Sequence, residues 1–285
     1  MPIMLRDLPI IKHFKSVINN LASHNFIYAV PFLGHPFNKT VRQQNANPKS
    51  IPIIIISFNQ LFYLKQLIDF LKKTGHTNIV ILDNTSDYAP LLEYYEQLAD
   101  SVTIHKMNTN RGHRAFWFSG EIYNRYRKGY FVITDPDIVP REDCPDDFLS
   151  YFKTLLDKNP FVKKVGFSLE LDDIPDTHPQ RQKVVDWESQ FWEKKTPDGN
   201  YSAIIDTTFA LYRPESRLFK YTNFFRGIRT KRPYTARHGG WYIDPVNMTD
   251  EQRYYYKKAT SSSTWRFDAD GNLVCDMYTR EKSPN

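Results

Sequence analysis

The sequence predicts an α/β protein with a doubly wound, mostly parallel central sheet that carries helices on both faces. Three observations support this prediction. Apolar runs typical of strands buried on both faces lie at 51–58, 78–84 and 130–137. Segments whose apolar residues keep helical spacing separate these runs. Strands that alternate with helices in this way form right-handed β-α-β units.

The first two units are the clearest. IPIIIISF at 51–58 predicts the first strand, and the helix expected at 59–76 has leucine and isoleucine on one face and Gly75 as its stop. A second strand at 78–84 precedes a helix at 88–100. In such sheets ligands bind beyond the carboxyl ends of the strands, so residues at those ends are the first candidates for a functional site.

The third unit has the same spacing. SVTIHKMN at 101–108 predicts a strand, AFWFSGEIYNRYRKG at 115–129 a helix, and YFVITDPD at 130–137 the fourth strand. Beyond residue 150 the alternation weakens. There we expect, in chain order, a helix at 148–160, a strand at 163–171, a loop at 172–182, an aromatic helix at 184–195, a long strand at 201–214, and no sheet period in 237–259 until a final helix.

Residues 1–50 are expected to form an N-terminal helical extension and a linker. Apolar residues from Leu8 to Leu21 keep helical spacing with lysines between them. This helix either packs as an arm against the domain or lies as a basic amphipathic helix on a membrane surface. The stretch 34–50, GHPFNKTVRQQNANPKS, is polar and rich in Asn and Pro, which is typical of a linker.

Composition restricts the partners and the compartment. The formal net charge of +6 favours an anionic partner, but the basic residues are scattered, which argues against a nucleic-acid surface. Cys144 and Cys275 are the two cysteines, so a disulfide framework is not expected. No secretory signal or bilayer-length apolar run is apparent. The expected location is the cytoplasm, at the inner face of the membrane if the N-terminal helix makes a peripheral contact.

Two carboxylates end the fourth strand. Asp135 and Asp137 stand one residue apart in VITDPDIVP, and residues i and i+2 of an extended segment point the same way. Repulsion and desolvation oppose such a pair unless a cation lies between its members. A hard divalent cation prefers oxygen ligands and could hold a diphosphate at this place. The alternative is that the two acids cap the following turn.

Four motifs in this order resemble the GT-A fold glycosyltransferases, in particular their family 2-like branch of bacterial and viral polysaccharide synthesis. They are IIIISFNQ, VILDNTS, NTNRGHRAFW and TDPDI, the last as the D-x-D motif. The resemblance implies a Rossmann-like sheet and metal-dependent transfer of a sugar from a nucleotide diphosphate donor, UDP-linked by preference, to a glycan or lipid-linked glycan. It implies a domain over 51–265, with a nucleotide-sugar half at 51–140, an acceptor half at 141–265, and a tail at 266–285.

Donor-binding residues follow from the same resemblance. Ser57 and Asn59 are expected near the nucleoside, and Asp83, with Asn84 beside it, near the base or ribose. Asp83 could instead cap the turn that it starts. The resemblance places Arg111, Arg114 and Asp135 against the base, the diphosphate or the sugar, and guanidinium groups suit phosphate oxygens. Exposed surface arginines are the alternative, and His113 is open between a site residue and a loop histidine.

The expected metal is Mn²⁺ or Mg²⁺, held by Asp135 and Asp137. The resemblance adds a late histidine, for which His238 in RHGGWYID is the candidate, and an imidazole ligand would favour Mn²⁺. The alternative for His238 is a histidine packed in a loop. Trp241 could stack on a sugar ring or fill the core.

An inverting transferase, the outcome slightly favoured here, needs a carboxylate base within reach of the acceptor hydroxyl. Asp206, where an apolar strand turns polar, is the first choice, with Glu188 and Asp173 as competitors. Asp206 could instead satisfy backbone donors. An aromatic set in the helix at 184–195 would either floor an acceptor site or form core: Trp187, Phe191 and Trp192.

Two other functions remain open at this point. A nucleotidyltransferase making an NDP-sugar shares the fold type, but it would need a glycine-rich basic loop after the first strand, and SFNQLFYL has no glycine. A non-catalytic sugar-nucleotide or glycan-binding module would be expected to have lost the metal ligands, and both aspartates are present.

Overall fold

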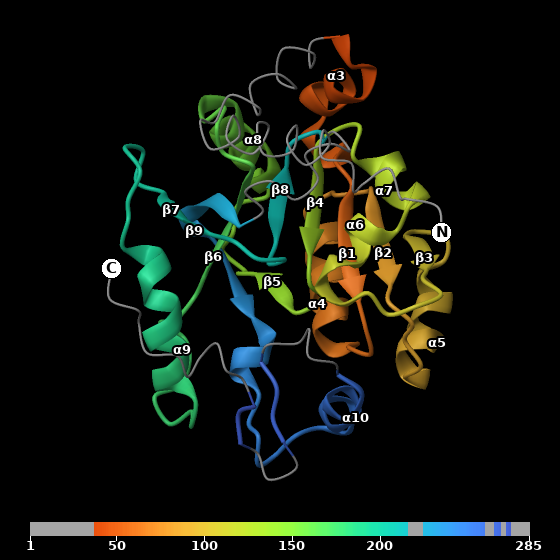
Figure 1. The fold of residues 1–285 in the computed structure, drawn as a ribbon, viewed down its shortest axis with the longest axis vertical. Helices are drawn as coiled ribbons and strands as arrows, with labels where there is room; N and C mark the ends of the chain where they lie inside the picture. Colours follow the sequence, from red (N-terminus) through yellow and green to blue (C-terminus); the bar gives the residue numbers. More distant parts are fainter. Residues whose placement is uncertain (1–36, 216–224, 260–264, 269–271, 275–285) are drawn as a thin grey trace, which may run out of the picture.

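A computed structural model of the chain describes residues 37–215, 225–259, 265–268 and 272–274. The helix predicted from Leu8 to Leu21, with its arm or membrane-surface role, lies outside the described residues, as does most of the predicted tail. In the described ranges the strands form one nine-stranded mixed sheet, in the order β3-β2-β1-β4-β8-β6-β9-β5 with β7 paired to β9. Figure 1 shows this sheet with its parallel half on the right.

The parallel half confirms the predicted β-α-β units. It contains four parallel strands: β1 (Ile53–Ser57), β2 (Ile79–Asp83), β3 (Thr103–Lys106) and β4 (Phe131–Thr134). Every residue of β1, β2 and β4 is buried, as a strand covered on both faces requires. β3 lies at the sheet edge, and its residues are half-buried or exposed.

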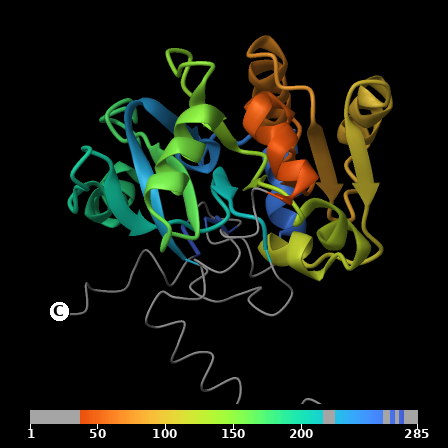
Figure 2. The same cartoon turned by 90° about the horizontal axis from the view of Figure 1, so that it is seen from above.

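Helices cover both faces of the sheet, which confirms the fold class. The period of two in β1 sends Ile53 and Ile55 to one core and Ile54 and Ile56 to the other. The first core receives α4 (Phe62–Lys73), α5 (Ala89–Leu98) and α8 (Phe148–Lys158), and the second receives α6 (Ala115–Phe118) and α7 (Glu121–Tyr126). Figure 2 shows α4 and α5 on the opposite side of the sheet from α6 and α7.

The helix expected at 115–129 is broken in two. Gly120 separates α6 from α7 and has φ of +63°, a left-handed conformation that favours glycine. The 3₁₀ turn η5 (Gly112–Arg114) leads into α6, and Gly112 also has positive φ.

The second half of the sheet is mixed, and here two sequence-based expectations are wrong. The long strand predicted at 201–214 is two strands, β7 (Tyr201–Ile204) and β8 (Ala210–Tyr212), with the turn 205–209 between them. β8 runs antiparallel between β4 and β6 (Lys164–Leu169), whereas β7 pairs with β9 (Arg226–His238). The 13-residue β9, which also pairs with β6 and β5 (Ile138–Pro140), was not predicted.

The remaining helices of the second half agree better with the sequence. The aromatic helix appears as α9 (Arg181–Glu188), which continues into the 3₁₀ turn η6 (Ser189–Trp192). The final helix is α10 (Asp250–Lys258), and it follows the 3₁₀ turn η8 (Gly239–Tyr242). The Thr249 hydroxyl accepts from the Gln252 amide, and the Gln252 side chain accepts from the Thr249 amide, so a capping box begins α10.

The stretch predicted as a linker is ordered instead. Asn38 caps α3 (Lys39–Ala46) by accepting from two backbone amides, and η4 (Pro48–Ser50) follows. The buried Gln44 side chain donates to the Tyr130 carbonyl and accepts from the Tyr130 amide, both at 2.8 Å. These two bonds pair the amide side chain with the backbone entering β4, which explains why so polar a segment docks. In the part of the chain that the structure describes, no helix is long and apolar enough to cross a membrane.

Candidate active site

A cavity of about 130 Å³ lies beyond the carboxyl ends of β1, β2 and β4. The D-x-D segment after β4 forms its floor together with Asp206 and His238. Phe58 after β1, Asn84 after β2, and Tyr255 and Tyr256 of α10 also line it, among other residues. The cavity therefore combines segments that are up to about 200 residues apart in the chain, at the sheet edge where the sequence predicts a ligand.

The two D-x-D carboxylates make different contacts. Asp135 Oδ2 accepts a hydrogen bond of 2.7 Å from the Thr207 hydroxyl. Asp137 Oδ2 lies 3.3 Å from the Gly240 amide, which donates to it, and 3.4 Å from His238 Nδ1. Burial raises the pKa of Asp135 well above its usual value, the charge of Asp137 raises it further, and the Thr207 bond opposes the shift. Two acids in this setting favour a bound cation.

His238 is held beside Asp137 by the sheet and by an aromatic ring. It ends β9, where it pairs with Ile138, so β5 brings the D-x-D segment and the histidine together. Its imidazole stacks on the indole of Trp241, with centroids 4.9 Å apart and planes inclined by 10°. Trp241 is only 1% exposed, so it fills the core and supports the imidazole rather than offering a free face to a sugar.

The two glycines after His238 permit this close approach. A Cβ at Gly239 would lie 2.5 Å from the Tyr63 ring, and one at Gly240 would lie 3.0 Å from the His238 ring. The Gly239 amide donates to the Asp137 carbonyl at 2.7 Å, and the Tyr63 hydroxyl donates to the Gly239 carbonyl at 2.9 Å. The backbone of η8 is thereby fixed to the D-x-D turn on one side and to α4 on the other.

Asp206 lies in the turn between β7 and β8 and faces the same cavity as Asp135 and Asp137. Its Oδ1 atom is buried and accepts no hydrogen bond from the described residues. Its backbone carbonyl accepts a bond of 2.9 Å from Lys164 Nζ. Asp206 thus does not satisfy backbone donors through Oδ1.

The donor atoms of these residues suit a divalent cation, but in the described residues they do not form a complete coordination site. In the described residues, no group of three or more His, Cys, Asp or Glu side chains is arranged to hold a metal ion. The fit comes from the donors: two acidic side chains at close quarters, and a buried imidazole nitrogen of His238 without a hydrogen-bond partner in the described ranges. Carboxylate oxygens with one imidazole nitrogen are ligands that Mn²⁺ accepts.

Two of the predicted donor-binding residues are engaged inside the protein. Ser57 and Asp83 are buried at the ends of β1 and β2, where the Tyr95 hydroxyl lies 2.9 Å from Ser57 Oγ and 3.2 Å from Asp83 Oδ1. Asp83 also accepts from the Ser86 amide, which is the turn-capping role given above as its alternative. Neither residue lines the cavity.

Asn59 and Asn84 shape the loops around the cavity. Asn59 has φ of +51°, and its side chain accepts from the Asp87 amide at 2.8 Å and donates to the Asp87 carboxylate at 2.9 Å. Asn84 accepts from the Arg111 amide and donates to Asn110, both at 2.8 Å, and of these two asparagines only Asn84 lines the cavity.

The loop that carries Arg111 and Arg114 places its histidine, not its arginines, in the cavity. Both arginine side chains are exposed and absent from the lining, and Arg114 Nε donates to His113 Nε2 at 3.1 Å. His113 lines the cavity. Burial lowers the pKa of His113, and the negative charge of Asp206, which lines the same cavity, opposes that shift.

The competing bases lie elsewhere. Glu188 is 2% exposed and forms a buried ion pair with Arg229. Burial raises the pKa of Glu188 to about 7, and Arg229 opposes the rise. Glu188 does not line the cavity. Of the aromatic set, Phe191 is buried, and Trp187 and Trp192 are half-buried. Arg229 lies 4.4 Å from the Phe191 ring centroid, Trp192 contacts Tyr201 edge-on, and Trp187 contacts Phe191, and none of the three aromatic residues lines the cavity.

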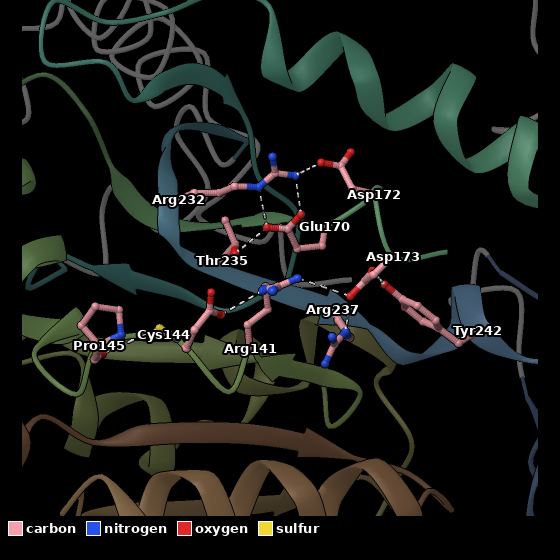
Figure 3. A network of polar contacts seen from close by, with 11 residues as sticks. Arg141, Cys144, Pro145, Glu170, Asp172, Asp173, Arg232, Thr235, Arg237 and Tyr242 are labelled. Carbon is pink, nitrogen blue, oxygen red and sulfur yellow. Dashed lines mark hydrogen bonds and ion pairs between the residues drawn. The ribbon is translucent and has the colours of Figure 1, made fainter. Parts of the chain in front are cut away.

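Asp173 belongs to a polar network at the C-terminal end of β9, next to His238. It accepts from Arg237 Nε and from the Tyr242 hydroxyl, both at 2.5 Å, and lies 3.5 Å from an Arg141 nitrogen (Figure 3). In the same view the buried Glu170 accepts two bonds from Arg232 and one from Thr235. These ion pairs hold β9 and η8 on either side of His238, so Asp173 supports the site without entering it.

Sequence reasoning missed the contribution of α10. None of its residues is buried, yet Tyr255 and Tyr256 line the cavity. Glu251 accepts from the Leu61 and Phe62 amides at the start of α4, and Lys258 forms an ion pair with Asp87. Three consecutive tyrosines in an otherwise polar helix were the available signal, since a solvated helix has no need of them.

No family model and no curated protein matches the chain. Among solved structures, it is similar to the mannosyltransferase PcManGT from Pyrobaculum calidifontis in complex with GDP-Man and Mn²⁺, with TM-score 0.41 and 14% identity over 84% of this chain and 72% of that one. It is similar to S. aureus TarS 1–349, with TM-score 0.39 and 12% identity over 73% of this chain and 64% of that one.

A third similar structure is a putative glucose-1-phosphate thymidylyltransferase from Bacillus anthracis in complex with a sucrose. Its TM-score is 0.35, with 12% identity over 74% of this chain and 84% of that one. At such identities the function has to be inferred from the residues of the site.

Proposed function

We propose that this protein is a metal-dependent glycosyltransferase that moves a sugar from a nucleotide diphosphate donor, UDP-linked by preference, to a glycan or lipid-linked glycan acceptor. One observation carries the proposal: Asp135, Asp137, Asp206 and His238 come from three separate parts of the chain and face one cavity at the carboxyl ends of the parallel strands. The resemblance of the four sequence motifs to the GT-A glycosyltransferases supports the same reaction.

Asp135, Asp137 and His238 would hold Mn²⁺ or Mg²⁺. When bound, the ion would offset the negative charge that grows on the departing nucleoside diphosphate. The protein itself supplies the surroundings: Thr207 orients Asp135, and the Gly240 amide orients Asp137. Asn84 would lie beside the nucleoside, with the aromatic rings of Phe58 and Tyr255 around it. In this proposal Ser57, Asn59 and Asp83 act indirectly, through the shape of the loops, and Arg111 and Arg114 stand outside the cavity lining.

Asp206 would take the proton of the acceptor hydroxyl as that oxygen attacks the anomeric carbon. Asp206 lines the cavity, where a carboxylate could accept that proton from a bound acceptor. A base on the opposite side of the sugar from the leaving diphosphate gives inversion, which is the outcome we expect. A second cavity of about 570 Å³ shares the lining residue Tyr256 with the first.

Donor hydrolysis tests the proposal. The full-length protein is incubated with UDP-, GDP- and dTDP-sugars in Mn²⁺, and the released nucleotide is separated by ion-exchange chromatography. A transferase releases the nucleoside diphosphate slowly, and EDTA stops the release. Exchange of pyrophosphate into the donor would indicate a nucleotidyltransferase instead. Binding of a donor without any turnover, with or without glycan acceptors, would indicate a binding module and overturn the proposal.

A further inference from the structure

A lysine is buried beneath the turn that carries Asp206. Lys164 of β6 has no exposed surface, and its Cα pairs with Tyr212 of β8 on one side and with Gly227 of β9 on the other. Its Nζ donates to the Asp206 carbonyl and to the Tyr212 hydroxyl, both at 2.9 Å. A lysine in the middle of a sheet core is uncommon because its ammonium group must be desolvated.

The turn 205–209 also contacts β6 at its other end, near Gly166 and Phe167. A Cβ at Gly166 would lie 2.4 Å from the Phe209 carbonyl, so the glycine lets the end of the turn lie directly on β6. The Phe167 amide donates to that carbonyl at 3.2 Å. Beyond Lys164, Thr207 bonds to Asp135. The turn is therefore held from below by β6 and from above by the D-x-D segment, with Asp206 between the two.

The electrostatics agree with this arrangement. Burial lowers the pKa of Lys164 well below its usual value, and the Asp206 charge is the largest influence that opposes the shift. The fold thus keeps a buried amine next to the backbone of the acid that faces the cavity. Lys163, the preceding residue, is also buried and forms an ion pair of 2.6 Å with Glu215.

We propose that Lys164 is a positioning residue: its bond to the Asp206 carbonyl fixes the 205–209 turn so that the Asp206 carboxylate faces the D-x-D acids and the acceptor hydroxyl. The inference rests on the proposed function in giving Asp206 the role of base. Lys164 has no surface in the cavity, so it acts only through the turn. Its removal should impair proton removal from the acceptor and leave donor binding in place.

The test compares Lys164→Met with Lys163→Met, which removes a buried ammonium one position away. Lys164→Met should lower kcat by about 10- to 100-fold, as expected for a misplaced catalytic group, and change the Kd of Mn²⁺·UDP by less than about threefold in calorimetry. Lys163→Met should lower the melting temperature to a similar extent without this loss of kcat. Equal losses of kcat in the two variants would overturn the inference, because they would report general destabilisation.

A double-mutant cycle with Asp206→Asn separates this inference from the function proposal. If Lys164 acts through Asp206, the double variant is no slower than Asp206→Asn alone, whereas multiplied losses overturn the inference. Normal turnover of Asp206→Asn removes the base assignment, and the inference with it, while Mn²⁺-dependent donor cleavage would still stand. Should Lys164→Met not fold, Lys164→Gln removes the charge and takes its place in the cycle.

A crystal structure of the Lys164 variant tests the placement without any substrate. The Asp206 carbonyl and Oδ1 should move away from their present positions, whereas Thr207 should keep its bond to Asp135. A turn that keeps its position without the lysine would overturn the inference, even if no donor is ever found to be cleaved.

Discussion

Gly239→Ala perturbs the site without removing any polar side chain. A new Cβ at residue 239 would lie 2.5 to 2.6 Å from three atoms of the Tyr63 ring, closer than any unstrained contact. The ring cannot simply turn away, because its hydroxyl donates to the Gly239 carbonyl. Either the ring gives up that bond or η8 moves away from the D-x-D turn, to which the Gly239 amide is tied.

The magnitude follows from three contributions. Overpacking costs about 1–3 kcal/mol, and loss of the Tyr63 hydrogen bond costs about 1 kcal/mol. Alanine restricts the unfolded chain and returns about 0.4–1 kcal/mol. The expected net loss is therefore about 1–3.6 kcal/mol in the free energy of unfolding. Because η8 follows His238 directly, the affinity for Mn²⁺·UDP should also fall.

Urea denaturation followed by tryptophan fluorescence measures the first effect, and calorimetry the second. Tyr63→Leu removes the ring atoms that the new Cβ would meet, so the double variant should lose less stability than the sum of the single variants. Strict additivity, or an alanine variant as stable as the natural protein, would refute the proposed clash and the tight seating of η8.

Three further predictions concern charged groups. Asp137→Asn should abolish Mn²⁺-dependent donor binding in calorimetry while the circular dichroism spectrum stays unchanged; unaltered donor affinity would remove Asp137 from the metal site. Asp206→Asn should keep donor binding and lose transfer to the acceptor by about 100-fold or more, as loss of a general base does, and normal turnover in the donor assay would argue against the base. His76, whose pKa burial lowers to about 4 from 6.5, should make the fold acid-sensitive. Since the unfolded chain binds the proton first, stability is complete above pH 6.5 and falls towards pH 4, by about 2 kcal/mol between pH 8 and pH 5. His76→Gln should flatten that part of the pH profile, and an unchanged slope in urea titrations would contradict the assignment.

The parallel half of the fold could be predicted because its signals are local. Strands β1, β2 and β4 are short apolar runs, and α4, the first helix between them, carries a clear apolar face, so no long-range information is needed. The break at Gly120 was visible only as a single glycine, which a helix can tolerate.

The mixed half could not be predicted in the same way. β9 contains Arg226, Arg229, Lys231 and Arg232, and its pattern has no clear period of two, because Arg229 is buried through its ion pair with Glu188 rather than by being apolar. Likewise α3 is too polar for a docked helix by composition, and its position depends on the buried Val41 and on the Gln44–Tyr130 bonds. Contacts of this kind depend on partners far away in sequence.

Among the candidate site residues, those with a local sequence signal line the cavity, whereas others have partners that are distant in sequence. Asp135 and Asp137 follow a strand whose end is evident, and Asp206 was selected because an apolar strand turns polar there. His238 was selected because the family resemblance implies a late histidine. Ser57, Asn59 and Asp83 were assigned by position, but their observed partners are Tyr95, Asp87 and Ser86. Glu188 looked available because its partner, Arg229, lies in the strand that was not predicted.

Because β9 and α10 lie late in the sequence, they leave the ribosome after the segments with which they pack. Strands β1 to β4 can pair as soon as they emerge, but β5 and β7 find their partner only when residues 226–238 follow, and α10 meets α4 later still. During synthesis the acids of the D-x-D turn therefore stay open to water until β9 and α10 have been added.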